Sequence, residues 1–180
     1  KFSSEIFGKI GATYPQNYET QNYLKKLNVK NIKLIGNLKF AKNKQDQKVL
    51  LDKSSIKQLK GKKIWCASST HPSEELLCAK AHIKIKKKYK NILTIIIPRH
   101  INRINEIKNE IQNLNLKVAI RSYGHKIKKD TDIYLVDTYG ETKKFYRYSN
   151  SVFLGGSMID HGGQNPIEPA RFGADIIHGP

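Results

Sequence analysis

The chain has 180 residues and a formal net charge of +18, from 33 lysines and arginines against 15 aspartates and glutamates. This length suits one good-sized domain, or one domain with a fragment of another. No apolar run approaches the length that crosses a bilayer, and the N-terminal sequence lacks a signal-peptide pattern, so we expect a soluble globular protein.

The large positive charge favours anionic partners: nucleic acid, an anionic membrane face or a phosphorylated substrate. The densest basic runs are Lys84–Lys90 and Lys126–Lys129. A solvated helix face and a loop explain these two runs more simply. The charge alone therefore leaves the partner open.

The sequence predicts no metal site. The two cysteines, Cys66 and Cys78, have no metal-ligand spacing and are expected to be buried thiols of a reducing compartment. The six histidines show no paired metal spacing either. Asp130-Thr131-Asp132 matches the Asp-x-Asp pattern of metal-dependent glycosyltransferases, but it lies among lysines at a strand entrance and is interpreted as a turn.

The first 37 residues predict two short strands around one helix. Strands are expected at Gly11–Gln16 and Asn31–Ile35, and a helix from the cap residue Asn17 to about Leu27. The polar, lysine-rich segment Gly36–Lys48 is interpreted as a linker with a domain boundary near it.

From residue 46 onward, predicted helices and strands alternate. Strands are expected at Lys63–Ala67, Asn91–Ile97, Lys117–Ile120, Asp132–Val136, Val152–Leu154 and Asp175–Ile177. Helices are expected at Asp46–Leu59, Ser73–Lys88, Asn102–Leu114, Glu141–Ser149 and Ile167–Phe172. Apolar strands that alternate with helices indicate the α/β class, with a Rossmann-like parallel sheet covered on both faces.

Polar loops follow five of these strands. Ligands of such sheets bind at the carboxyl ends of the strands. The loops are Ser68–His71, Pro98-Arg99-His100, Arg121-Ser122, Asp137–Glu141 and Gly155-Gly156-Ser157. The sequence therefore predicts one polar rim that binds a ligand.

The stretch Phe153–Arg171 predicts an anion site on this rim. Glycines after a strand let backbone N–H groups approach a ligand, and a helix N-terminus adds free donors and a partial positive charge. Asn165 is the expected N-cap and Pro166 the first helical residue, with Glu168 in the first turn. Two surface turns and a capped helix would give the same pattern.

Together, these loops resemble the 3-deoxy-D-manno-octulosonic acid (Kdo) transferases of lipopolysaccharide synthesis. The resemblance covers nearly the whole chain from about Gly11. Its motifs are Gly36–Phe40, Trp65 with Ser69-Thr70-His71 and Glu74-Glu75, Pro98-Arg99-His100 with Arg103, Arg121-Ser122, Asp137–Glu141, Gly155-Gly156-Ser157 and Gly162–Ala170. The sequence departs from the family at Ser73, where glycine is usual, and at Gln164, where histidine is common.

The resemblance implies the C-terminal domain of a glycosyltransferase B (GT-B) architecture. Residues 1–37 would be the end of the N-terminal acceptor domain and the crossing between domains, and residues 38–180 the CMP-Kdo-binding domain, truncated at its C-terminus. The full-length enzyme would transfer Kdo, with inversion, from CMP-Kdo to the lipid A precursor at the cytoplasmic face of the bacterial inner membrane. It would contact that anionic membrane surface, and neither a cofactor nor a nucleic acid is expected.

The resemblance also implies roles for rim residues, all in substrate binding. Arg99 would pair with phosphate or the sugar carboxylate, and His100 would add a donor. The remaining positions are Ser69, Thr70 and His71 facing the interdomain cleft, Gly140 and Glu141 at the nucleoside, Gly155, Gly156, Ser157 and Asn165 at the phosphate, and Glu168 at the ribose hydroxyls. The general base is expected in the acceptor domain, so no catalytic residue is assigned here, and this fragment should bind nucleotide weakly without turnover.

Two alternatives stay open. One is a glycosyltransferase or epimerase of the same fold that uses a UDP-sugar. The other is a non-enzymatic nucleic-acid-binding module, argued from charge alone, although no base-stacking motif lies near the lysine runs.

Overall fold

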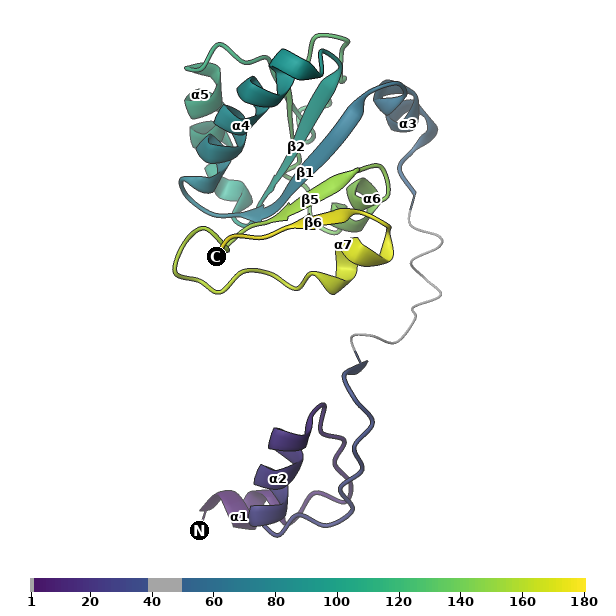
Figure 1. Cartoon of the computed structure of the whole chain (residues 1–180), viewed down its shortest axis with the longest axis vertical. Helices are drawn as coiled ribbons and strands as arrows, with labels where there is room; N and C mark the ends of the chain where they lie inside the picture. The colour runs from purple at the N-terminus through teal and green to yellow at the C-terminus, as the bar shows by residue number, and fades with distance from the viewer. Residues whose placement is uncertain (1, 39–49) are drawn as a thin grey trace. The chain divides into compact units, whose positions relative to one another are not determined.

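A computed structural model describes residues 2–38 and 50–180 of the chain. The chain divides into two compact units, Lys1–Lys44 and Gln45–Pro180 (Figure 1). The residues from 39 to 49, which include Lys39 and Phe40 of the first family motif, lie outside the described part.

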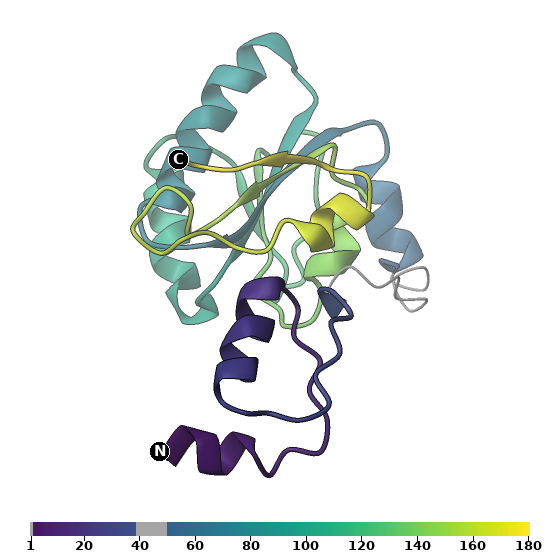
Figure 2. The same ribbon diagram turned by 60° about the horizontal axis from the view of Figure 1, so that its bottom comes forward.

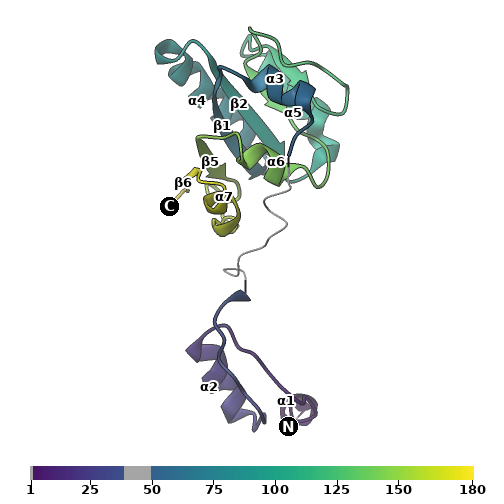
Figure 3. The ribbon, with the colours of Figure 1, turned by 90° about the vertical axis from the view of Figure 1, so that its right-hand side faces the viewer.

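The first unit contains two helices, α1 (Phe2–Phe7) and α2 (Tyr18–Lys26). Asn17 caps α2 as predicted, because its side chain accepts a hydrogen bond from the N–H of Thr20 at 2.8 Å. Helix α1 was not predicted, and in Figure 3 it is seen end-on while α2 runs across the view. The two predicted strands of this unit reduce to one parallel bridge between Thr13 and Ile32.

The second unit is built on one six-stranded parallel sheet (Figure 1). The strands are β1 (Lys63–Thr70), β2 (Ile92–Pro98), β3 (Val118–Ile120), β4 (Ile133–Leu135), β5 (Ser151–Leu154) and β6 (Asp175–Ile177). Their order is β3-β4-β2-β1-β5-β6, and every adjacent pair is parallel. The predicted Rossmann-like α/β class is confirmed.

Helices cover both faces of this sheet. On one face lie α4 (Glu74–Lys88) and α5 (Ile104–Gln112), which follows a short 3₁₀ turn, Ile101–Arg103. On the other face lie α3 (Lys53–Leu59), α6 (Thr142–Tyr146) and α7 (Ile167–Arg171). Figures 1 and 2 show α6 and α7 side by side, in agreement with their contacts. These layers bury a core on each side of the sheet, so its strand ends are held rigidly.

Strand β1 is longer than predicted. Ser68 and Thr70 are buried and pair with Ile97 and Pro98, so much of the expected loop Ser68–His71 is strand. Polar residues continue this strand because hydrogen bonds inside the protein satisfy their hydroxyl groups: Ser68 Oγ lies 2.6 Å from the Tyr146 hydroxyl oxygen.

Helix α3 starts later than predicted. It begins at Lys53, since the Asp52 side chain accepts the N–H of Ser55 at 2.9 Å and so caps the helix. Residues 46–49 of the predicted helix lie outside the described part of the chain.

Candidate functional site

Three adjacent strands bring their polar loops together at the carboxyl edge of the sheet. His71 follows β1, Arg99 follows β2, and Gly156 follows β5, and β1 lies between the other two strands. The N–H of Arg99 donates to the Thr70 carbonyl at 2.9 Å. This part of the predicted rim is therefore one continuous surface.

Three histidine rings gather on this surface. The ring centroid of His71 lies 4.6 Å from that of His161 and 5.9 Å from that of His100. We call these three residues the histidine group. Gly156 lies against two of the rings, because a Cβ placed on it would come 3.2 Å from His161 Cδ2 and 3.5 Å from His71 Cδ2.

His71 carries an open hydrogen-bonding position. Its residue surface is 8% exposed, and its Nε2 atom is buried with no hydrogen-bond partner among the described residues. Burial, and then the neighbouring His161, lower the pKa of His71, so its ring is neutral at neutral pH. A buried ring nitrogen without a partner is unfavourable, and a bound polar ligand would remove that penalty.

In the structure, the glycine loop makes hydrogen bonds to other groups of the protein. The N–H of Gly155 donates to the Ser68 carbonyl, and the N–H of Gly156 donates to Oε2 of Glu74, both at 2.8 Å. The Ser157 hydroxyl donates to the Leu154 carbonyl and accepts the N–H of Gly179 at 3.0 Å. Groups of the protein itself therefore occupy the Gly155 and Gly156 N–H groups, which were predicted to meet a phosphate, and the Ser157 hydroxyl is engaged within the protein as well.

Glu74 fills the place expected for a ligand anion. It is 1% exposed, and besides Gly156 it accepts the N–H of His71 at 2.9 Å and that of Met158 at 3.1 Å. Sequence analysis noted Glu74 only as part of a motif. The loop that meets it lies more than 80 positions later in the chain, so no local pattern indicates the contact.

Two non-glycine residues near the turn from β1 to α4 have left-handed backbone: Ser69, at an irregularity near the end of β1, with φ +56°, and Ser73, just before α4, with φ +76°. Ser73 thus adopts the conformation that glycine favours, at the position where the resemblance leads us to expect glycine. Thr70 is buried and donates from its hydroxyl to Glu75 at 3.0 Å, so its side chain supports the loop from inside. Glu75 in turn accepts from Arg103 at 3.2 Å.

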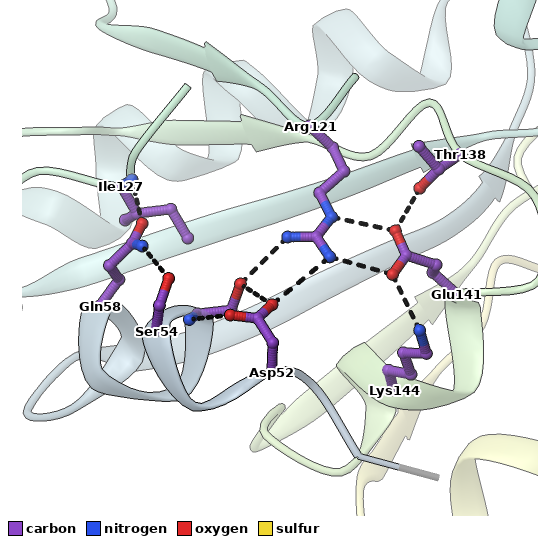
Figure 4. Close-up of polar contacts among 9 residues, drawn as sticks. Asp52, Ser54, Gln58, Arg121, Ile127, Thr138, Glu141 and Lys144 are labelled. Atoms are coloured by element: carbon purple, nitrogen blue, oxygen red, sulfur yellow. Dashed lines mark hydrogen bonds and ion pairs between the residues drawn. The ribbon is translucent and has the colours of Figure 1, made fainter. Parts of the chain in front are cut away.

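Glu141 belongs to a second polar group, at the ends of β3 and β4 (Figure 4). Arg121 donates to both carboxylate oxygens of Glu141 at 3.0 Å, and Lys144 adds a third contact at 3.0 Å. The Arg121 hydrogen bond lowers the pKa of Glu141 to about 2. The Glu141 carboxylate is thus engaged with cations, while Gly140 beside it is exposed.

Asn165 and Glu168 lie at the start of α7. Asn165 Oδ1 accepts the N–H of Ile167 at 3.0 Å, but α7 begins at Ile167, so Pro166 and not the predicted Asn165 stands at the N-cap position. The Glu168 side chain is 48% exposed and lies 3.5 Å from the Lys143 ammonium on α6. Glu168 is therefore open to exchange its partner with a ligand.

Asp130 and Asp132 make structural contacts, in line with their interpretation as a turn. Asp130 pairs with Lys117, and Asp132 accepts the N–H of Lys117 and lies against His82 and Lys86. Within residues 2–38 and 50–180, no group of three or more His, Cys, Asp or Glu side chains is arranged to hold a metal ion. In the same ranges, no helix is long and apolar enough to span a bilayer.

Separate lysine-rich segments meet at the amino end of the sheet, opposite the histidine group. They surround a hollow of about 740 Å³, which we call the lysine hollow. Its lysines are Lys57, Lys60, Lys62, Lys90, Lys128 and Lys129. Part of the run Lys84–Lys90 and part of Lys126–Lys129 thus share one surface, which the sequence did not indicate.

Comparison with known proteins gives the family. No protein-family model matches the chain. It is 34% identical over 165 residues to the 3-deoxy-D-manno-octulosonic acid transferase of Haemophilus influenzae, covering 90% of this chain and 37% of the relative. It is 33% identical over 156 residues to the transferase of the same name from Rickettsia bellii, covering 86% of this chain and 37% of the relative. The chain thus spans little more than a third of these relatives.

A solved structure also matches the chain. It is the C-terminal CMP-Kdo binding domain of WaaA from Acinetobacter baumannii, 30% identical in sequence, with a TM-score of 0.64. The match covers 74% of this chain and 67% of that domain. The chain therefore belongs to the 3-deoxy-D-manno-octulosonic acid transferase family, whose C-terminal domain it matches.

Proposed function

We propose that this chain carries the donor-binding half of a Kdo transferase, which moves Kdo from CMP-Kdo to the lipid A precursor in lipopolysaccharide synthesis. The observation that carries the proposal is the histidine group beside Arg99, with the open Nε2 of His71, at the edge where parallel sheets bind ligands. The CMP-Kdo-binding domain that the chain matches supports the choice of donor.

The residues suit a donor with two negative charges. CMP-Kdo carries a phosphodiester and the carboxylate of the sugar. Arginine binds planar anions through paired donors, and imidazole adds single N–H donors. In this proposal Arg99 and His100, both exposed, meet the phosphate or the sugar carboxylate, and His71 donates from Nε2. Such donors stabilise the charge that develops on the departing CMP.

The nucleoside would extend across the neighbouring loops. Gly140 is exposed and so leaves room for a ring beside Glu141. Glu168 would exchange Lys143 for the ribose hydroxyls, and Asn165 would hold the start of its helix in place. Ser69, half-exposed at the end of β1, would face the acceptor.

The complete enzyme would have GT-B architecture and act with inversion. Inversion requires a general base on the side of the sugar opposite the leaving group. We assign that base to the acceptor domain, of which residues 1–37 would be the end, and no cofactor is needed. Residues 38–180 would bind the donor, and the chain by itself would bind nucleotide without transferring sugar.

We also propose that the lysine hollow faces the anionic cytoplasmic surface of the inner membrane. Its six lysines surround a single carboxylate, that of Asp130. The six lysines give this surface a positive charge, although burial lowers the pKa of Lys62, whose ammonium donates to the Lys129 carbonyl at 3.1 Å. Lipid phosphates would neutralise it, each nearby lysine contributing about 1 kcal/mol.

Isothermal titration calorimetry with CMP tests the proposed donor site. We expect CMP to bind the wild-type chain, and Arg99→Ala and His71→Ala each to weaken binding about tenfold or more, because each removes a charged or buried donor. Lys80→Ala removes one exposed charge from the middle of α4 and is the matched control. Equal loss of affinity in all three variants would contradict the site.

A further inference from the structure

We infer that Glu74 is the positioning residue of the donor site: a built-in carboxylate that holds the glycine loop and His71 in the arrangement that receives the donor. The consequence for CMP-Kdo rests on the proposed function. That Glu74 fixes the position of the glycine loop rests on the structure alone.

The contacts of Glu74 join two segments that are far apart in the sequence. Its Oε2 accepts the N–H groups of His71, at 2.9 Å, and Gly156, at 2.8 Å, and its Oε1 accepts that of Met158 at 3.1 Å. Backbone N–H groups that converge on one point in this way form an anion-binding concavity. In this protein the anion is a side chain of α4, so a ligand need not be present for the loop to be ordered.

These bonds determine where the histidine rings lie. The backbone of His71 is tied to Glu74, and Gly156, tied to the same oxygen, lies against the rings of both His71 and His161. While these hydrogen bonds are formed, the unpaired Nε2 of His71 stays beside His161. In the strand order β5-β1-β2, the loop that carries Arg99 follows the neighbouring strand β2. Glu74 therefore acts on the donor through His71, without touching it.

A carboxylate is required for this role, because an amide has only one accepting atom. In Glu74→Gln the NH₂ group would face at least one of the three backbone N–H donors and leave it unpaired. The size and shape of the side chain would hardly change. This variant consequently separates the hydrogen bonds from simple filling of space.

The matched control is Asp132→Asn. Asp132 is also a buried carboxylate that accepts a backbone N–H, that of Lys117 at 2.9 Å, but it lies where β4 begins, at the opposite end of the sheet. Both variants should lose stability. Only Glu74→Gln should weaken CMP binding, by about tenfold at a temperature where both proteins are folded, whereas Asp132→Asn should stay within about twofold of wild type.

Hydrogen exchange and chemical rescue separate positioning from folding. In Glu74→Gln the amides of Gly156 and Met158 should exchange faster than in wild type, while amides of β2 should not change. In Glu74→Ala, added formate should restore part of the CMP affinity by filling the vacated anion position, and it should not rescue His71→Ala.

The outcomes separate the two proposals. Wild-type CMP affinity in Glu74→Gln, or unchanged exchange at Gly156 and Met158, would overturn the role of Glu74. Failure of the wild-type chain to bind CMP would overturn the proposed function. In that case the exchange data, together with NMR titration of the His71 ring in Glu74→Gln, would still show whether Glu74 fixes the position of the loop.

Discussion

The N–H of Gly156 donates to the buried carboxylate of Glu74 at 2.8 Å. A loop whose glycines suggested a phosphate site is therefore closed by a side chain of the protein. In the proposed function, recognition of an anion at this edge would therefore fall to side chains such as His71, whose Nε2 has no hydrogen-bond partner among the described residues.

Gly156→Ala should destabilise the protein and weaken CMP binding. The left-handed backbone at Gly156, with φ of +74°, disfavours a side chain by about 1–2 kcal/mol. The added Cβ would also press on the rings of His161 and His71. Urea unfolding and CMP titration would measure the two effects.

Gly124→Ala is the control for this prediction. Gly124 has a similar φ of +67°, but a Cβ there would meet open space. Gly124→Ala should lose only the stability that the strained backbone costs, and it should keep its affinity for CMP. If the two alanine variants behaved alike, the contact of Gly156 with the histidine rings would have no consequence.

Acidification should destabilise the protein through Glu141. The pKa of Glu141 is lowered from its ordinary value to about 2 by Arg121, so its contribution to stability is complete above about pH 4.5 and is lost as the pH falls toward 2. Solvent screening reduces that contribution to about 1–2 kcal/mol. Urea unfolding at a series of pH values would show this loss, and Arg121→Gln should remove most of it.

CMP affinity should increase as the pH falls from about 7.5 to 6. In the free protein, burial and then His161 keep the pKa of His71 low, whereas a bound phosphate would raise it. Binding therefore takes up a proton, and lower pH favours the complex. His71→Asn should lose the part of the pH dependence that does not come from CMP itself, and an identical pH profile in that variant would exclude His71 as the responsive group.

Ser73→Gly should stabilise the protein. Removing the strained left-handed side chain stabilises the folded protein by about 1–2 kcal/mol. The greater conformational freedom of glycine in the unfolded chain destabilises it by about 0.5–1 kcal/mol, so we expect a net stabilisation of about 0.5–1 kcal/mol. Ser54→Gly in α3 provides the opposite sign, because glycine weakens a helix interior. Thermal unfolding of both variants would check this prediction, and destabilisation by Ser73→Gly would contradict it.

Binding to lipid vesicles tests the proposed membrane contact of the lysine hollow. Replacing Lys60, Lys90 and Lys128 by glutamine should reduce co-sedimentation with vesicles of anionic phospholipid. Replacing Lys25, Lys26 and Lys80, which removes the same charge elsewhere, should have a smaller effect. Equal effects would mean that only net charge matters. Salt-sensitive binding to single-stranded RNA that also depends on the hollow would favour the nucleic-acid alternative.

The core of the fold could be predicted from the sequence. Strands such as β2 are buried along their whole length and are mostly apolar and β-branched, and this pattern gives both their position and the parallel, doubly covered sheet. Strand ends were harder to predict. Thr70 looked like a loop residue, because its partner, Glu75, satisfies its hydroxyl only in the folded protein.

The candidate site could be predicted only in part. The rule that ligands bind at strand ends brought His71, Arg99 and Gly156 together, and the structure agrees. It could not indicate that Glu74 occupies the Gly156 N–H, or that His161 lies against His71. Both contacts join segments that are distant in the sequence, and a lone glutamate in a first helical turn has an ordinary explanation, its attraction to the helix dipole.

The central claim is that this chain binds the nucleotide of CMP-Kdo at the carboxyl edge of β1, β2 and β5. Calorimetric titration of the wild-type chain with CMP and, separately, with UDP tests it most directly. We predict that CMP binds more tightly than UDP and that Arg99→Ala weakens CMP binding about tenfold or more. Tighter binding of UDP, or CMP binding that Arg99→Ala leaves intact, would contradict it.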